Sequence, residues 1–479
     1  MREDGRGVIV NYLPVIGLEI HCELLTASKV FCSCANAFGG EPNTRVCPVC
    51  SGMPGTLPRL NRNAVRLAAK AGLALSCTVN NYSAFDRKNY FYPDLPKAYQ
   101  ITQFYRPICS DGSIRLSDGR DIRIERIHIE EDAGKLTHSG SVSLADYNRC
   151  GVPLIEIVTA PDLRSAEETQ ELVRKIALRL KYAGVCDGRM EQGSLRVDVN
   201  ISLMREGSDV FGTRAELKNI NSIRSIGRAI EYEIRRQSEI LDGGGSVIQE
   251  TRRFDEASGN TLSMRSKAEA HDYRYFPEPD IPPVYLTDEQ IESFRAELPE
   301  MPASRLARYN AAGLSDDDAA LLAASREMSD FYDAAVSVYP NHRRIAATLL
   351  VDVNYHINNS GKGISEVRFT PADIAELVRL TDEGVISKNA AKDVLEIMFY
   401  KGGAPADIIE KHSLAMTRDT GRTEEKVNEI INANPGSVEQ YRAGNTKVIA
   451  FFMGQAMRSL GKGADPKLVR EAILRRLEE

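Results

Sequence analysis

Residues 15–24 read VIGLEIHCEL, and their alternation is typical of a β-strand with two different faces. One face is apolar and consists of Ile16, Leu18, Ile20, Cys22 and Leu24. The other face carries Glu19, His21 and Glu23. A sheet can bury one face and leave the other polar, but two carboxylates flanking an imidazole are an unusual polar face. This stretch predicts a strand that presents acids to a site.

Four further segments place acids on strand-like runs in the same half of the chain. IHIEEDAGK includes Glu130 and Glu131, and PLIEIV places Glu156 inside an apolar run, where an unpaired charge would be costly. LRVDVNIS aligns Arg196 with Asp198, and TRAELKNIN aligns Glu216 with Lys218. If these strands share a sheet, the acids converge and need a compensating cation. Oxygen ligands with one imidazole suit Mg²⁺ and bound phosphate, although ordinary polar strand faces with ion pairs are the alternative.

Common nucleotide-binding motifs are missing from the sequence. EDAGKLT contains Gly134 and Lys135 but has no glycine five residues before Gly134, so it is not a Walker A loop. No GxGxxG motif opens a strand-to-helix turn. Any ATP would therefore bind by a less common arrangement.

A second candidate site is a cysteine cluster in residues 32–50. Two close pairs of cysteines are separated by a loop rich in Gly, Pro and Asn, and they are Cys32, Cys34, Cys47 and Cys50. This spacing predicts a structural Zn²⁺ site, with four reduced loop cysteines as the alternative. A third segment, FDRKNYFYPDLPKAYQITQFY (85–105), combines cations with hydrogen-bonding aromatic residues and suggests a site-lining loop.

The pattern of predicted secondary structure changes near residue 290. Before it, short β-like runs alternate with helical patterns at about 165–183 and 222–241, and YFPEPDIPPVYL (275–286) is a proline-rich boundary. After it the patterns are helical, with a second hinge at 400–408. We therefore expect an α+β fold in which a strand-rich domain (1–292) precedes a helical domain (293–405) and a small helical tail (406–479).

The amino-acid composition limits the classes of protein to which the chain can belong. The chain has 479 residues, of which 42% are hydrophobic and 27% charged, with a net charge of −6. No run of about 18 apolar residues predicts a membrane span, and nine mostly scattered cysteines suit a reducing compartment. We expect a cytoplasmic protein. Residues 406–479 carry 12 Lys+Arg against 11 Asp+Glu, so this tail is less acidic than the rest and weakly favours an anionic partner there.

Eight motifs together carry a resemblance to a known family. They are GLEIH, FDRKNYFYPDLPKAYQI, HIEEDAGK, PLIEIV, EQGSLRVDVNIS, AELKNIN, ETRRFDE and DYRYFPEPDIPP. In this order the chain resembles, over nearly its whole length, the B subunits of bacterial aspartyl/glutamyl-tRNA amidotransferases. The resemblance implies a cradle domain, a helical domain and a YqeY-like tail that grips tRNA. It also implies ATP- and Mg²⁺-dependent phosphorylation of the side-chain carboxylate of Glu-tRNA(Gln) and/or Asp-tRNA(Asn), with ammonia supplied by the glutaminase (A) subunit and with the C subunit as a further partner.

The resemblance also implies roles for individual residues. The expected Mg²⁺ ligands are Glu19, His21, Glu130, Glu131, Glu156, Asp198 and Glu216. Catalytic roles fall on Glu131, Glu156, Lys88 and Lys218, and ATP or phosphate contacts fall on Arg196, Lys218, Tyr90 and Asn89. The four cysteines would hold a structural Zn²⁺. Expected tRNA contacts in the tail are Lys447, Arg458, Lys462, Lys467 and Arg470.

Three other interpretations compete with this one. A relative of the archaeal E subunits would carry a large inserted domain, whereas residues 272–294 pass directly into a helical pattern. A non-catalytic tRNA-binding scaffold would be favoured by missing acids on the strand faces, and none of the expected acids is missing. An independent metal-dependent hydrolase would hydrolyse ATP without tRNA.

Overall fold

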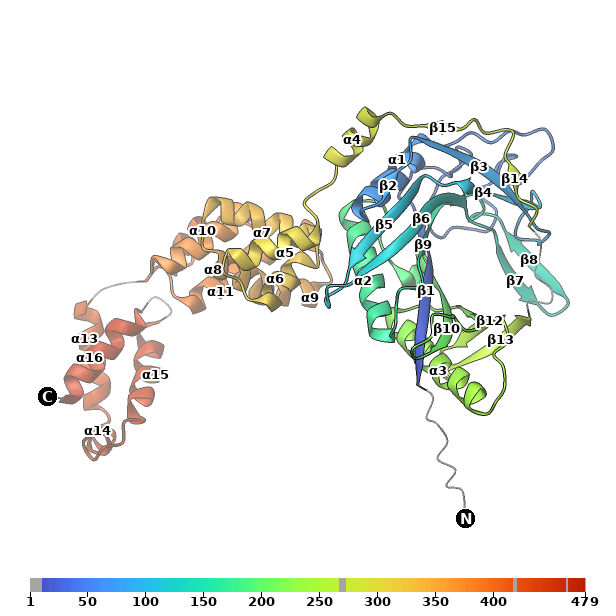
Figure 1. The fold of residues 1–479 in the computed structure, drawn as a ribbon. Coiled ribbons are helices and arrows are strands. Elements are labelled where there is room, and N and C mark those ends of the chain that lie inside the picture. The colour runs from blue at the N-terminus through green and yellow to red at the C-terminus, as the bar shows by residue number, and fades with distance from the viewer. Residues whose placement is uncertain (1–10, 267–272, 417–419, 462–463, 479) are drawn as a thin grey trace, which may run out of the picture. The chain divides into compact units, whose positions relative to one another are not determined.

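The chain forms two compact units, Met1–Met301 and Pro302–Glu479. The computed structural model describes residues 11–266, 273–416, 420–461 and 464–478, so that Lys462 lies outside the described residues (Figure 1). Strands dominate the first unit and helices make up the second, which confirms the predicted α+β class. Among the described residues, no helix has the length and apolar character needed to cross a membrane.

A nine-stranded sheet is the centre of the first unit, and its strand order is β13-β12-β11-β10-β1-β9-β6-β5-β2. Neighbouring strands are antiparallel except for the parallel pair β11 and β12. The strands are β1 (Tyr12–Glu23), β2 (Thr78–Val79), β5 (Cys109–Arg115), β6 (Asp121–Glu131), β9 (Pro153–Thr159), β10 (Leu195–Arg205), β11 (Ala215–Lys218), β12 (Glu250–Asp255) and β13 (Asn260–Ser266). The long opening strand, β1, therefore lies in the middle of the sheet, between two strands that come much later in the sequence.

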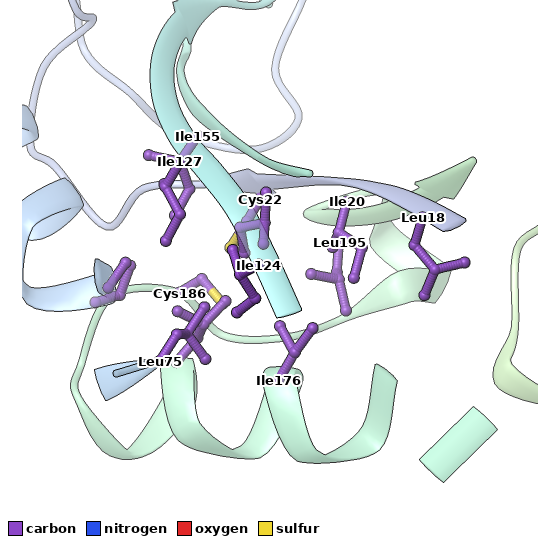
Figure 2. Packing of buried hydrophobic residues seen from close by; sticks show 14 of the residues in the cluster. Leu18, Ile20, Cys22, Leu75, Ile124, Ile127, Ile155, Ile176, Cys186 and Leu195 are labelled. Carbon is purple, nitrogen blue, oxygen red and sulfur yellow. The ribbon is translucent and has the colours of Figure 1, made fainter. Parts of the chain in front are cut away.

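Helices cover one face of this sheet. They are α1 (Arg62–Ala74), α2 (Ala166–Tyr182) and α3 (Ile223–Asp242), and the last two confirm the predicted helices at 165–183 and 222–241. Figure 2 shows Leu18, Ile20 and Cys22 of β1 packed in one cluster with Ile176 of α2. Because side chains alternate along a strand, burying this set directs the polar set of β1 to the opposite face.

Smaller elements complete the first unit. A second sheet joins β3 (Tyr82–Asn89) to β4 (Tyr99–Arg106), β14 (Phe276–Pro277) and β15 (Val284–Tyr285). A separate hairpin consists of β7 (Lys135–Ser139) and β8 (Val142–Asp146), and α4 (Asp288–Ala296) ends the unit. The strand β3 carries the Arg87–Asn89 part of the aromatic and cationic segment, which is thus a sheet element rather than only a loop.

The second unit contains two separate apolar clusters, one between Tyr309 and Leu414 and one between Val427 and Leu477. The finer division of this unit at residue 405 stays a prediction. Its helices are α5 (Pro302–Ala311), α6 (Asp316–Ala323), α7 (Arg326–Val338), α8 (His342–Ala347), α9 (Asn354–Ser360), α10 (Pro371–Asp382), α11 (Lys388–Lys401), α12 (Pro405–Lys411), α13 (Thr420–Asn432), α14 (Pro435–Arg442), α15 (Val448–Leu460) and α16 (Pro466–Glu478).

Candidate active site

The sheet face opposite the helices gathers the predicted acids. His21 of β1 lies opposite Glu156 of β9 on one side and opposite Arg196 of β10 on the other. Glu19, two residues earlier, lies opposite Asp198. Residues far apart in the sequence therefore meet on one face because β1 pairs with both strands.

The first cluster on this face consists of His21, Glu130 and Glu156. Each offers one potential ligand atom, and these atoms all lie within 4.8 Å of one another. His21 Nε2 is 3.5 Å from Glu130 Oε1 and 3.5 Å from Glu156 Oε2. Two carboxylates around one imidazole nitrogen form a donor set that fits a divalent cation with open positions for other ligands.

The electrostatics of this cluster favour a positive charge at its centre. Burial alone would lower the pKa of His21, but its hydrogen bond to Glu156 and the charge of Glu130 raise that pKa to about 9. Burial raises the pKa of Glu130 despite the nearby His21. Burial would also raise the pKa of Glu156, yet the contacts with His128 and His21 lower it well below its usual value. A bound cation would replace the proton on His21 and would itself balance the charge of the two carboxylates, because a metal-ligating imidazole is neutral.

His128 is a member of this cluster that the sequence-based interpretation missed. Its Nε2 is 3.3 Å from Glu156 Oε2 and 3.9 Å from Glu130 Oε2, and only 7% of its side chain is exposed. The alternation in IHIEED was the available signal, because residues 128 and 130 share a strand face. His128 therefore contacts the two carboxylates that would hold an ion.

A second cluster, Glu19, Asp198 and Glu216, lies beside the first. Its potential ligand atoms also lie within 4.8 Å of one another. Lys218 Nζ is 2.5 Å from Asp198 Oδ2 and 2.9 Å from Glu216 Oε1, and Asn200 Nδ2 donates to Glu19 Oε1 at 3.0 Å. Burial, followed by the charges of nearby glutamates, raises the pKa of Glu19. Three carboxylates against one lysine leave this cluster with excess negative charge, which a bound cation would balance.

Glu131 lies on the other face of β6, and this placement corrects its expected convergence with His21 and Glu156. Lys97 Nζ is 2.6 Å from both of its carboxylate oxygens, and the backbone N–H of Ile101 donates to Glu131 Oε1 at 2.9 Å. The physical reason is strand alternation, because neighbours in a strand point to opposite faces. Within the described residues, Glu131 therefore belongs to neither carboxylate cluster.

Lys88 is the predicted cation that approaches the first cluster from the second sheet. Its Nζ lies 4.9 Å from the centre of the Tyr273 ring and 6.0 Å from that of Tyr90, and among the described residues it forms no ion pair. Burial would lower the pKa of Lys88, but the charge of Glu130 and other acidic groups raise it. Burial also raises the pKa of Tyr90. A charged lysine is thus available beside the acids.

Two other predicted contacts already have protein partners. Asn89 Nδ2 donates to the backbone carbonyl of Arg274 at 2.9 Å, so its side chain joins β3 to the segment before β14. Arg196 Nη2 is 2.9 Å from Asp132 Oδ2, whereas its buried Nε has no hydrogen-bond partner among the described residues. The structure therefore gives Asn89 a structural contact, whereas Arg196 keeps further guanidinium N–H donors beyond the one that contacts Asp132.

A cavity of about 430 Å³ adjoins the second cluster. Glu19 and Asn200 lie in its wall, and the wall continues through the segment Phe211–Arg214. This volume falls within the usual range for small-ligand pockets. The face therefore offers a recess next to an acidic cluster.

The four predicted cysteines also come together, with their sulfur atoms within 4.8 Å of one another. Cys34 Sγ and Cys47 Sγ each lie 3.9 Å from Cys50 Sγ. Four sulfurs at about 2.3 Å from one tetrahedral Zn²⁺ would be about 3.8 Å apart, so the spacing fits this ion. A hydrogen bond from Cys32, with the charge of Lys29 contributing, lowers the pKa of Cys50 to about 4, whereas the same hydrogen bond raises the pKa of Cys32, so that Cys50 is the thiolate of this pair.

The predicted tRNA contacts lie on the last helices of the second unit. Lys447 precedes α15, Arg458 is in its last turn, and Lys467 and Arg470 are in α16. All four side chains are exposed, and no ion pair involves them among the described residues. They are therefore accessible cations, and their role stays a prediction.

Comparison with known proteins matches two family models to the chain. The GatB/GatE catalytic domain covers residues 14–292, and a GatB domain of YqeY type covers residues 330–477. The chain is 52% identical over 470 residues to the B subunit of the aspartyl/glutamyl-tRNA(Asn/Gln) amidotransferase of Ruminiclostridium cellulolyticum, with 97% of each chain covered. It is 49% identical over 475 residues to the B subunit of the same name from Myxococcus xanthus, with 98% of this chain and 99% of the relative covered.

This identity extends over almost the full length of both chains, and the relatives are B subunits, as the resemblance in the sequence predicted. The first family model ends where the proline-rich boundary gives way to helices. The chain therefore belongs to the B subunits of the aspartyl/glutamyl-tRNA(Asn/Gln) amidotransferases, which act in protein biosynthesis as ligases that form a carbon–nitrogen bond.

Proposed function

We propose that the chain uses ATP to activate the side-chain carboxylate of Glu-tRNA(Gln) and/or Asp-tRNA(Asn). The carboxylate oxygen attacks the γ-phosphorus, the bond to ADP breaks, and an acyl phosphate forms. Ammonia from the glutaminase (A) subunit then attacks the carbonyl carbon, phosphate leaves with the C–O bonding electrons, and the nitrogen loses a proton. The products are the amidated aminoacyl-tRNA, ADP and phosphate.

The observation that carries this proposal is the pair of acidic clusters on one sheet face. His21, Glu130 and Glu156 would hold one Mg²⁺, and Glu19, Asp198 and Glu216 would hold a second. When bound, Mg²⁺ neutralises phosphate charge and aligns the reacting groups. Such a site needs little covalent chemistry from the protein, since positioning and charge neutralisation supply most of the catalysis in phosphoryl transfer.

The chain's own residues have distinct tasks in this scheme. Lys88, which forms no ion pair among the described residues and whose pKa is raised by the charge of Glu130, would contact a phosphate oxygen. Lys218 holds Asp198 and Glu216 in place and can contact phosphate from the same position. The cavity beside Glu19 would accommodate the nucleoside part of ATP.

Several partners follow from the same proposal. The chain would act in the cytoplasm within a heterotrimer that also contains the A and C subunits. Zinc held by the four cysteines would be structural, because four thiolates leave no open coordination position. The exposed cations of α15 and α16 would hold tRNA phosphates without reading sequence.

Reconstitution tests the proposal. The chain is mixed with the A and C subunits, Mg²⁺-ATP, glutamine and Glu-tRNA(Gln), and Gln-tRNA(Gln) is measured together with the glutamate that the glutaminase releases. Glu156→Gln should lower amide formation at least 100-fold and leave the glutaminase reaction detectable. The exposed Glu292→Gln on α4 is the matched control and should behave as the unaltered chain does. Full amide formation by Glu156→Gln would contradict the proposal.

A further inference from the structure

The strand that carries Glu130 extends beyond its neighbour. Pairing between β5 and β6 ends at the register pair Cys109 and Ile127, whereas β6 continues to Glu131. On its other side β6 stays paired with β9 as far as Glu131. In an antiparallel sheet alternate residues direct their backbone groups to the same side, so Ile129 and Glu131 face the edge that β5 leaves open.

Two glutamine side chains occupy this open edge. Gln103 Oε1 accepts from the backbone N–H of Ile129 at 3.0 Å, and Gln100 Nε2 donates to the backbone carbonyl of Glu131 at 2.7 Å. Both glutamines belong to β4 and are buried. They thus substitute for a neighbouring strand on either side of Glu130.

A β-bulge directs the two amides to the same edge. Residues three apart normally point to opposite faces of a strand, but the register of β3 and β4 shifts between Ala84 and Asp86, where Arg106 and Thr102 are the partners. The additional residues lie in β4, and a bulge of this kind re-aims a side chain. Asp86 supports the bulge because its Oδ2 accepts from the backbone N–H groups of Phe104 and Tyr105 at 2.8 and 3.0 Å.

A buried ion pair fixes the same segment from the core face. Glu131 contacts Lys97 through both carboxylate oxygens and accepts from the N–H of Ile101. Its side chain is 2% exposed and that of Lys97 is 13% exposed. Breaking a buried ion pair is costly because it leaves one charge without compensation, so the pair with Lys97 holds Glu131 in this position.

Burial of the Gln103 side-chain amide costs free energy. The hydrogen bond that its Oε1 accepts from the backbone N–H of Ile129 is the contact that offsets this cost. Among the described residues its buried Nε2 has no hydrogen-bond partner. A buried donor without a partner is unfavourable, because it loses its hydrogen bonds to water and gains none in the protein. A side chain that served only to fill the core would avoid this cost, so the position of Gln103 is explained by holding the backbone of β6.

We propose that Lys97, Gln100, Gln103 and Glu131 form a clamp of positioning residues that sets Glu130 for binding a divalent ion. The proposal rests on the proposed function, which makes Glu130 a ligand. It assigns Glu131 to the support of the metal site rather than to its ligand set. Groups that orient metal ligands typically change metal affinity about 10- to 100-fold when they are replaced.

The test measures binding of Mn²⁺, as a probe for Mg²⁺, to the full-length chain by electron paramagnetic resonance. Gln103→Met keeps the length of the side chain and removes the acceptor for Ile129, and we expect about tenfold weaker Mn²⁺ binding. In the reconstituted complex the same variant should raise the Mg²⁺ concentration needed for half-maximal activity. The matched control is Gln237→Met, which removes an equally buried amide that donates to Ile201 O and to Glu233 in the α3 region.

The outcomes separate the clamp from the metal site itself. Weaker Mn²⁺ binding by Gln103→Met, with unchanged binding by Gln237→Met, supports the clamp. Unchanged binding by a folded Gln103→Met chain overturns the clamp alone, whereas an unaltered chain that binds no Mn²⁺ overturns the proposed metal site and the clamp together. If Gln103→Met fails to fold, Asp86→Asn is tested instead, because it weakens the support of the bulge without replacing a residue of the clamp. Unchanged Mn²⁺ affinity in this variant overturns the clamp.

Discussion

At the scale of single residues, strand alternation decides which acid joins which site. Glu130, Glu131 and Asp132 are consecutive, yet Glu130 meets His21, Glu131 meets Lys97, and Asp132 meets Arg196. One step along the chain reverses the face that a side chain occupies. The run of three acids is therefore not one ligand set but three different contacts.

His128 gives the first prediction. Because His128 Nε2 approaches both Glu156 and Glu130, His128→Asn should leave these carboxylates less well oriented and weaken Mn²⁺ binding about tenfold. Titration with Mn²⁺ measures the effect. His342→Asn is the control, since His342 contacts the hydroxyl of Tyr332 in the second unit. Equal Mn²⁺ affinity in both variants would show that His128 does not support the cluster.

The sequence predicted most of the acidic cluster because single residues carried the signal. Glu156 within an apolar run and His21 between two glutamates are unusual in isolation, and both are in the site. The sequence could not assign Glu131 to a face of the strand, because either of the two adjacent glutamates, Glu130 or Glu131, could have pointed to the face that carries His21. Gln100 and Gln103 gave no signal because only a bulge in β4 brings them to the same edge.

At the scale of elements, helix α3 is tied to the sheet by a buried carboxylate. Glu233 contacts Arg236 on its own helix at 2.8 Å and Arg252 of β12 at 3.0 Å. Burial alone would raise the pKa of Glu233, but the hydrogen bonds from Arg236 and Thr261 lower it below 4.5. The stabilisation that follows is fully present above pH 4.5 and is lost as the pH falls through the lower folded-state value.

We therefore predict that Glu233→Gln destabilises the first unit by about 3 kcal/mol at pH 7, because Arg236 loses its charge partner and the buried Arg252 keeps only Glu250. The free-energy difference from the unaltered chain should narrow as the pH drops below 4.5. Urea unfolding followed by circular dichroism at pH 7 and at lower pH measures it. Glu239→Gln, an exposed change on the same helix, is the control. A difference that does not change with pH would contradict this account of Glu233.

The cysteine loop is a second element with a direct test. Cys50 lies within 3.9 Å of two other sulfurs, and Lys29 Nζ lies 3.5 Å from its sulfur, so Cys50→Ser should abolish zinc binding. Elemental analysis of protein purified under reducing conditions should find about one zinc per unaltered chain and none in the variant. Cys77→Ser is the control, because Cys77 is a buried cysteine outside the cluster. If the unaltered chain contained no zinc, the proposed zinc site would be excluded.

At the scale of the whole molecule, the two units divide the expected work. The first unit contains both carboxylate clusters, and the exposed cations of α15 and α16 belong to the second. Replacing Lys447, Arg458, Lys467 and Arg470 by Ala should raise the KM for tRNA and change kcat little. If each cation contacts one phosphate, the salt dependence of tRNA binding should become less steep by roughly 0.9 per lost contact.

Binding measured over a range of KCl concentrations tests this prediction. The control replaces four exposed lysines of the same unit, Lys388, Lys392, Lys401 and Lys411. Equal salt dependence in the tail variant and the unaltered chain would exclude the tail as the tRNA-binding element.

The order of the elements was more predictable than their assembly. The helical patterns predicted α2 and α3 within a residue or two, and in α2 the signal was Leu172, Ile176 and Leu180, which repeat on one helix face. The sheet order was not predictable, since β1 pairs with strands that lie well over a hundred residues away. The acids meet only through this long-range pairing, and local patterns do not encode it.

The central claim is that two acidic clusters on one sheet face hold divalent ions that bind a nucleotide. The most direct test is a crystal structure of the chain with Mn²⁺ and a non-hydrolysable ATP analogue, with the ions located by anomalous scattering. We predict Mn²⁺ peaks coordinated by His21, Glu130 and Glu156 and by Glu19, Asp198 and Glu216. A nucleotide bound elsewhere, with no anomalous peak at either cluster, would contradict the claim.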